Sequence, residues 1–133
     1  MPYQKEFSAM ANNYAEFGHP CPIRDVLDRI GDQWSLLILE SLAKETYRFN
    51  ALHREIGDIS RQMLTVTLKR LEFDGYISRT VFAEVPTRVE YRLTALGESF
   101  LQPLRQLVEW ADTHHEAICY ARKINGDSSL SDQ

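Results

Sequence analysis

Apolar side chains in the middle of this chain change from the spacing of a helix to the spacing of a strand within a short stretch. Three leucines recur at intervals of four and three residues, as on one face of a helix: Leu64, Leu68 and Leu71. Beyond Gly75, the segment 87–93 instead alternates apolar and charged residues, as a half-buried strand does. A helix with one buried face that leads straight into a hairpin restricts the fold to a small helical domain with a short sheet.

The remaining segments carry helix and turn signals that set the order of the elements. Pro22 suits the first position of a helix that Gly31 ends, and Asp32 can cap the next helix. We expect this order: a helix at 22–30, a helix after Asp32, a short strand at 47–49, a helix between Asn50 and Gly57, a helix from Ser60 to about Asp74, strands at 76–85 and 87–93, and a helix from Thr94 to about Asn125.

The two middle helices, the turn at 57–59 and the hairpin together predict a winged helix-turn-helix. The expected fold class is therefore mainly α with a small β-hairpin wing (α+β). We expect a single domain over residues 1–125. In it, an N-terminal arm at 1–19 and a C-terminal helix at 94–125 serve dimerisation, and a disordered tail follows at 126–133.

Length and composition are consistent with one folded domain. The chain has 133 residues, of which 44% are hydrophobic, a share too high for a disordered protein. No apolar run approaches the roughly 18 residues that a membrane-spanning helix needs. The first residues lack the apolar core of an export signal. We therefore expect a cytoplasmic protein.

The net charge of −4 argues weakly against a polybasic nucleic-acid binder, but the charge is unevenly distributed. Residues 44–93 hold nine Lys/Arg against seven Asp/Glu, a net charge of +2. The rest of the chain holds six against twelve, a net charge of −6. A net charge as small as +2 favours binding through placed contacts and two half-sites over bulk attraction.

Three stretches of the chain resemble the HxlR-type winged helix regulators. Residues 21–42 match their opening motif, a Cys-Pro followed by Ile-Gly-x-x-Trp. Residues 48–79 resemble their helix-turn-helix, and residues 81–100 resemble their wing and the start of their dimerisation helix. The resemblance implies cytoplasmic bacterial transcription regulators that bind operators as dimers, many of them repressors. It also implies that some members sense oxidants or electrophiles through the cysteine that corresponds to Cys21.

The helix predicted at 60–74 presents polar and cationic side chains on the face opposite its leucines. On a helical wheel the outward positions are Gln62, Thr65, Val66, Lys69 and Arg70. A reader of the major groove needs donors and acceptors near the start of its helix. Gln62 can pair with adenine there, and Arg61 can swing out to guanine or to a phosphate.

Other residues of this helix suit the thymine methyl group and the DNA backbone. Thr65 and Val66 can contact the methyl group of thymine. Lys69 and Arg70 suit phosphates, and Ser60 would present backbone N–H groups to a phosphate. The alternative is a solvated helix face with no ligand.

Two further arginines are candidate DNA contacts. Arg88, which follows Pro86 at the wing tip, can enter a narrow minor groove or bind a phosphate. The alternative for Arg88 is a charge pair with Glu84 or Glu90 inside the hairpin. Arg48, just before the first helix of the helix-turn-helix, is a candidate phosphate contact.

The two cysteines, Cys21 and Cys119, are candidate redox-sensing residues. As the N-cap of the first helix, Cys21 lies at the positive end of a helix dipole, which favours the reactive thiolate. The alternative is a small packing residue. If dimerisation brings Cys119 near the partner's Cys21, a disulfide between subunits can form, provided that their Cα atoms lie within about 7 Å. The spacing of His115 and Cys119 is too weak a signal for us to expect a metal site.

The helix predicted at 94–125 carries more apolar surface than a small winged domain needs. One stripe contains Phe100, Leu104, Leu107, Ala111 and Ile118, and its neighbours Leu101, Val108 and Trp110 widen it. Left exposed, such a patch would be unusually large. It predicts a two-fold homodimer, the alternative being a core within one chain.

Together these features predict a homodimeric, sequence-specific DNA-binding transcription regulator. We expect a repressor on a palindromic operator, with Cys21 as its candidate switch. Its expected partners are double-stranded DNA, a second copy of the chain and an oxidant, electrophile or small-molecule effector. The alternatives are a small-molecule-responsive regulator without thiol sensing and a winged-helix protein-interaction module. The sequence has no Gly-rich phosphate loop and no nucleophile elbow, so we expect neither an enzyme nor a cofactor.

Overall fold

The computed structural model describes residues 21–131, in two compact units. The boundary between the units lies between Glu98 and Ser99, inside one helix. The single domain that we expect over residues 1–125 stays a prediction. The predicted N-terminal arm at 1–19 and residues 132–133 of the predicted tail lie outside the described residues.

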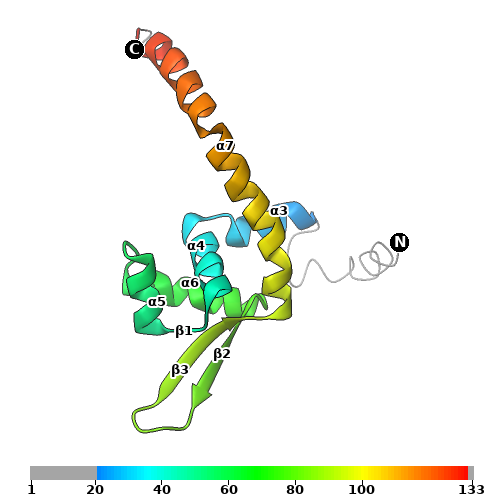
Figure 1. The fold of residues 1–133 in the computed structure, drawn as a ribbon, viewed down its shortest axis with the longest axis vertical. Helices are drawn as coiled ribbons and strands as arrows, with labels where there is room; N and C mark the ends of the chain where they lie inside the picture. Colours follow the sequence, from blue (N-terminus) through cyan, green and yellow to red (C-terminus); the bar gives the residue numbers. More distant parts are fainter. Residues whose placement is uncertain (1–20, 132–133) are drawn as a thin grey trace, which may run out of the picture. The chain divides into compact units, whose positions relative to one another are not determined.

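The elements follow one another in the predicted order (Figure 1). They are α3 (Pro22–Ile30), α4 (Gln33–Lys44), β1 (Tyr47–Arg48), α5 (Phe49–Ile56), α6 (Arg61–Phe73), β2 (Ile77–Phe82), β3 (Arg88–Leu93) and α7 (Ala95–Ser131). The expected fold class is confirmed: the chain is mainly helical, with a small antiparallel sheet and a hairpin after the helix-turn-helix.

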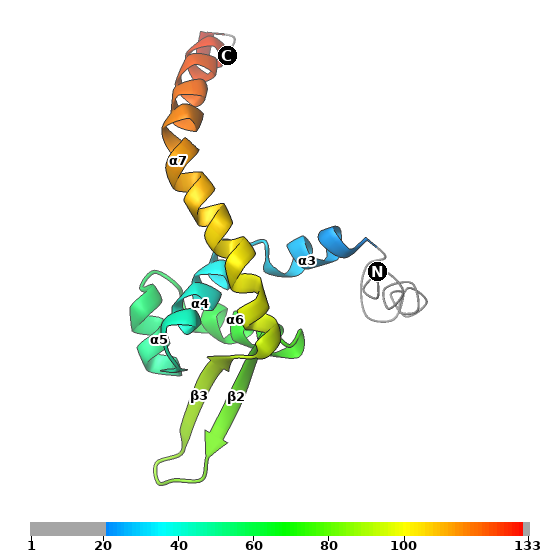
Figure 2. The ribbon, with the colours of Figure 1, turned by 45° about the vertical axis from the view of Figure 1, so that its right-hand side comes forward.

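The three strands form a sheet of order β1-β3-β2. Ile77 pairs with Leu93 and Phe82 with Arg88, so β2 and β3 form the wing, and Tyr47 pairs with Tyr91. Because side chains alternate along a strand, one face of the sheet carries the buried side chains Tyr47, Ile77 and Tyr91. Figure 2 shows the hairpin extending away from α4, α5 and α6.

The core of the first unit is made where the helix-turn-helix packs on α4. Besides the leucines of α6, its buried side chains come from α4, α5 and the turn between α5 and α6. They are Ile38, Leu39 and Leu42 of α4, Leu52 of α5 and Ile59 of the turn. The turn between α5 and α6 requires Gly57, whose φ of 89° is a conformation that side chains disfavour. The His53 ring N–H donates to the carbonyl of Ile59 at 2.8 Å, which fixes the end of the turn.

Helix α7 begins just after β3 and ends later than expected. The Thr94 hydroxyl accepts from the N–H of Gly97 at 3.1 Å and so caps the helix. We expected the helix to end near Asn125, because Gly126 and the polar residues after it are poor helix formers. It extends to Ser131 instead, since each residue added to an existing helix brings one more backbone hydrogen bond. Within residues 21–131, no helix is both long and apolar enough to span a membrane.

Gly97 allows α7 to approach the residues that precede β2, and this contact generates a stability prediction. A Cβ atom added at Gly97 would lie 2.1 Å from the carbonyl oxygen of Tyr76. Gly97→Ala should therefore lower the free energy of unfolding by about 1–3 kcal/mol, as overpacking does. Gly126→Ala is the matched control, because nothing lies within 4 Å of the added Cβ there. Thermal unfolding of both variants measures the effect, and an unchanged Tm for Gly97→Ala would contradict a close approach of α7 to Tyr76.

Candidate nucleic-acid interface

Helix α6 is fixed by the burial of one of its faces. Leu64, Leu68 and Leu71 are fully or almost fully buried, as their spacing predicts. Burying a leucine side chain contributes roughly 1.5–3 kcal/mol, so these three residues dominate the attachment of the helix. Between them, the buried Thr67 hydroxyl donates to the carbonyl of Met63 at 2.7 Å and leaves no polar atom unsatisfied there.

The start of α6 is capped as predicted. The Ser60 hydroxyl oxygen accepts from the backbone N–H of Met63 at 3.0 Å. This bond uses one of the donors that the first turn of a helix leaves without an acceptor. The end of α6 is tied to α3, because the Arg29 guanidinium donates to the Asp74 carboxylate. That hydrogen bond is the main reason why the pKa of Arg29 is raised.

The burial of the leucines leaves four predicted residues on the outer side of α6. Gln62, Val66 and Lys69 are exposed, and Thr65 is half-buried. The Thr65 hydroxyl donates to the carbonyl of Arg61 at 2.8 Å, so its methyl group remains for an apolar contact. The outer side of α6 thus offers an amide, two apolar groups and an ammonium group.

Two exposed apolar residues of α6 were not identified from the sequence. The side chain of Met63 is 42% exposed and that of Phe73 is 82% exposed. On a helical wheel Phe73 shares the direction of Val66, so the spacing that identified the outer face could have found it. The Arg29 guanidinium carbon lies 6.0 Å from the centre of the Phe73 ring, which draws Arg29 toward the end of α6.

Arg61 is held against the first helix of the helix-turn-helix. Its guanidinium donates to the Asn50 side-chain oxygen at 2.8 Å and lies 5.8 Å from the centre of the Phe49 ring. The hydrogen bond is exposed, so the guanidinium stays close to solvent. Arg61 therefore joins the start of α6 to the start of α5.

We expected Arg70 to point outward, but it does not. Its guanidinium lies 3.6 Å from the Asp32 carboxylate at the start of α4, and its side chain is half-buried. The position at the edge of the outer face brings it within reach of that acidic residue, which a helical wheel of α6 alone does not include. Arg70 therefore ties α6 to α4 in this structure.

Arg88 is paired within the wing, which is the alternative that the sequence left open. Its guanidinium lies 3.2 Å from the Glu84 carboxylate, 3.5 Å from the Glu90 carboxylate and 3.9 Å from the centre of the Phe82 ring. These contacts fold the side chain back along the hairpin. Arg48, at the start of α5, is exposed.

A cavity of about 310 Å³ is lined by residues of α6 and of the wing strands. Thr65 and Lys69 of α6 line one side, and Arg79 of β2 and Tyr91 of β3 line another. Arg79 is exposed, and Glu72 also reaches the cavity. The structure thus brings Lys69 close to a strand cation that is far from it in sequence.

The two predicted redox residues are both exposed thiols. Cys21 is the N-cap of α3, as expected, in an extended conformation and without a side-chain capping bond to the helix. Cys119 lies on α7 with its sulfur 3.5 Å from Nε2 of His115. Among the side chains of residues 21–126, no three or more His, Cys, Asp or Glu form a cluster that could hold a metal ion.

Transcription regulators are among the known proteins that this chain resembles in sequence and fold. A model of the HxlR-like helix-turn-helix family matches residues 29–118. An HTH-type transcriptional regulator of Escherichia coli, YtfH, is 41% identical over 80% of this chain and 84% of its own length.

Two solved structures are similar to this chain in fold as well as in sequence. The regulator ytfH of Salmonella typhimurium has 36% identity and a TM-score of 0.69, over 81% of this chain and 96% of its own. The redox regulator HypR in its oxidised form has 35% identity and a TM-score of 0.65, over 70% of this chain and 96% of its own. The YtfH proteins of both bacteria are named transcriptional regulators. The chain belongs to the HxlR-like helix-turn-helix family of transcriptional regulators.

Proposed function

We propose that the protein is a homodimeric repressor that reads a palindromic operator with the outer side of α6. The observation that carries this proposal is the exposed set Gln62, Val66 and Lys69 beside the capped start of the helix. In a helix-turn-helix, this part of the second helix lies in the major groove. Because the proposed ligand is DNA, we place the protein in the cytoplasm.

Each residue of the outer side has a proposed role. Gln62 pairs with adenine, whereas Thr65 and Val66 contact a thymine methyl group. Lys69 and Arg61 bind phosphates, and so do the N–H groups that follow Ser60.

The remaining arginines near α6 differ in how freely they can reach DNA. Arg79 lies across the cavity from Lys69. It would bind the phosphate backbone that separates the major groove read by α6 from the minor groove under the wing. Arg70 has no role in this surface because of its ion pair with Asp32. Arg88 would reach DNA only by leaving Glu84 and Glu90.

A dimer accounts for the apolar side chains of the second unit. Leu107 is 54% exposed and Trp110 is 52% exposed in the single chain, and Val108 and Ile124 are exposed as well. A helix surface of this kind is covered by a symmetric copy of itself in many oligomers. Two copies would present two α6 helices to two half-sites.

A thiol switch at Cys21 is the second part of the proposal. It is supported by the exposure of Cys21 and by the similarity to HypR, a redox regulator. The other candidate is a regulator that responds to a small molecule and does not use a thiol as its sensor. A winged-helix module for protein contact alone is disfavoured by the family, whose members regulate transcription.

The first prediction separates base reading from phosphate binding. Gln62→Ala should change the preferred base at one position, at a cost of about 1–3 kcal/mol for the preferred site. Lys69→Ala should weaken binding to all sequences and lower the salt dependence of log K by about one. Electrophoretic shifts at several salt concentrations, on a duplex selected from a random pool, measure both effects. Lys123→Ala is the matched control, and salt-independent losses of equal size in both test variants would refute the assignment.

The second prediction concerns the dimer. Leu107→Glu should convert the protein to a monomer, because it places a charge inside the proposed apolar interface. The neighbouring exposed residue supplies the control, Gln106→Glu, which should remain a dimer. Sedimentation equilibrium gives the mass of each variant. A Leu107→Glu protein that stays dimeric would place the interface elsewhere.

The third prediction concerns the thiols. Diamide should alter operator binding by the unchanged protein and leave Cys21→Ser unaffected. If the partner's Cys21 pairs with Cys119, two thiols lose their hydrogens to diamide, which becomes a hydrazine, and a dimer band appears on a non-reducing gel. Cys119→Ser should abolish that band. A monomer band throughout would count against the disulfide, and unchanged DNA binding after diamide would count against the switch.

A further inference from the structure

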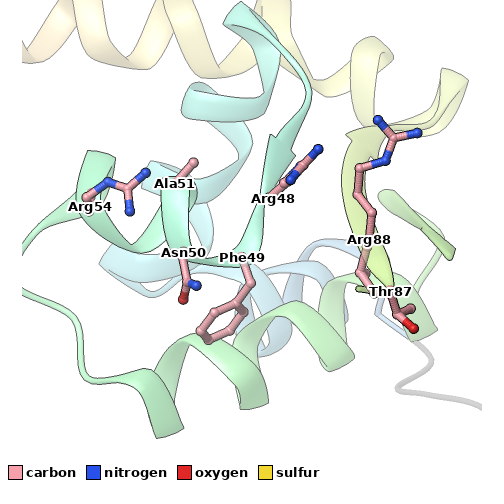
Figure 3. A pocket seen from close by; sticks show the side chains of 8 residues that line it. Arg48, Phe49, Asn50, Ala51, Arg54, Thr87 and Arg88 are labelled. Atoms are coloured by element: carbon pink, nitrogen blue, oxygen red, sulfur yellow. The ribbon is translucent and has the colours of Figure 1, made fainter. Parts of the chain in front are cut away.

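A second cavity lies beside the first turn of α5, apart from the outer side of α6. Its volume is about 460 Å³, and it lies between the β1–α5 junction and the start of β3. Figure 3 shows the side chains of Arg48, Arg54 and Arg88 on one side of this junction. Phe49 and Asn50 point the other way, toward α6.

The charge of this cavity is positive and largely unbalanced. Three arginines line it, and none of its lining residues is acidic. Arg88 is balanced by Glu84 and Glu90. Arg48 and Arg54 are exposed, and neither forms an ion pair with another side chain of residues 21–126. Within residues 21–126, no carboxylate therefore balances the two guanidinium groups that line the cavity.

The first turn of α5 adds hydrogen-bond donors to the same wall. Helices usually begin with Ser, Thr, Asp or Asn, whose oxygen accepts from the first turn. Here the N-cap is Arg48, which supplies no side-chain acceptor. Phe49, Asn50 and Ala51, which form this turn, line the cavity. Their N–H groups have no acceptor within the helix, and they lie at the positive end of its dipole.

We propose that this cavity is an anion site that binds a phosphoryl group, with Arg48 and Arg54 as its cationic residues and the first turn of α5 as its neutral donors. Guanidinium groups bind phosphate oxygens in pairs of hydrogen bonds, and backbone N–H groups can supply the rest. The volume exceeds what a single carboxylate needs and lies within the usual range of ligand pockets.

The phosphoryl group can come from two sources. One is a phosphodiester of the duplex outside the half-site, and this source rests on the proposed function. The other is a free phosphorylated compound. Arg54 belongs to this site under either source, although the sequence did not identify it. It was missed because only the fold places Arg54 of α5 and Arg88 of β3 around the same cavity.

One arm of the test uses DNA. The double variant Arg48→Gln/Arg54→Gln is compared with Arg105→Gln, an exposed arginine of α7 that does not line the cavity. On a duplex selected from a random pool, the double variant should bind about tenfold more weakly or worse, with a lower salt dependence. The preferred bases should not change. Thermal unfolding checks that both variants fold, which we expect because the substituted side chains are exposed.

The other arm uses inorganic pyrophosphate and the free protein. The backbone amide resonances of Phe49, Asn50 and Ala51 should shift on addition of pyrophosphate to the unchanged protein and to Arg105→Gln. They should not shift in the double variant. Sodium chloride at equal ionic strength controls for screening.

The two arms together separate the outcomes. Weaker duplex binding by the double variant supports the DNA source, whether or not pyrophosphate binds. Pyrophosphate binding that depends on the arginines, with unchanged duplex binding, supports a free phosphorylated ligand. If the unchanged protein binds no duplex but does bind pyrophosphate, the proposed function fails and the anion site stands. The proposal is overturned if the double variant behaves like Arg105→Gln in both arms.

Discussion

The burial of three leucines on one face of α6 is the interaction on which the rest of this surface depends. Leu64, Leu68 and Leu71 fix the rotation of the helix about its axis, and that rotation decides which residues face solvent. A change in rotation by one position would bury Lys69 or Gln62 at a large desolvation cost. The same packing thus stabilises the unit and determines the residues that α6 offers to DNA.

Much of the positive charge around α6 holds the protein together. Arg29 binds Asp74, Arg70 lies beside Asp32, and Arg88 lies between two glutamates of the wing. These ion pairs are only partly buried, so water still screens them, and each contributes on the order of 1 kcal/mol. A phosphate could therefore replace a carboxylate beside Arg88 at little cost, whereas Arg29 and Arg70 would have to leave the elements that they connect. This difference separates a wing that can adapt to DNA from a helix that is held in place.

The sequence predicted the elements and the outer side of α6, because both follow from local spacing. The leucine intervals, the Ser60 cap and the alternation in β3 each involve residues close together in the chain. The residues that the arginines contact could not be predicted in this way. Arg70 meets Asp32 of α4 and Arg61 meets Asn50 of α5, and such partners become visible only when the helices are packed.

The acidity of the whole chain is compatible with DNA binding and favours a dimer. Residues 44–93 carry a net charge of only +2, and the other residues carry −6, so a duplex is attracted to one segment and repelled by the rest. A single copy with so few positive charges would release few counterions and bind weakly. Two linked copies act on one duplex with a high effective concentration for the second half-site. In the proposed dimer, the apolar side chains of α7 would therefore raise DNA affinity although none of them needs to contact DNA.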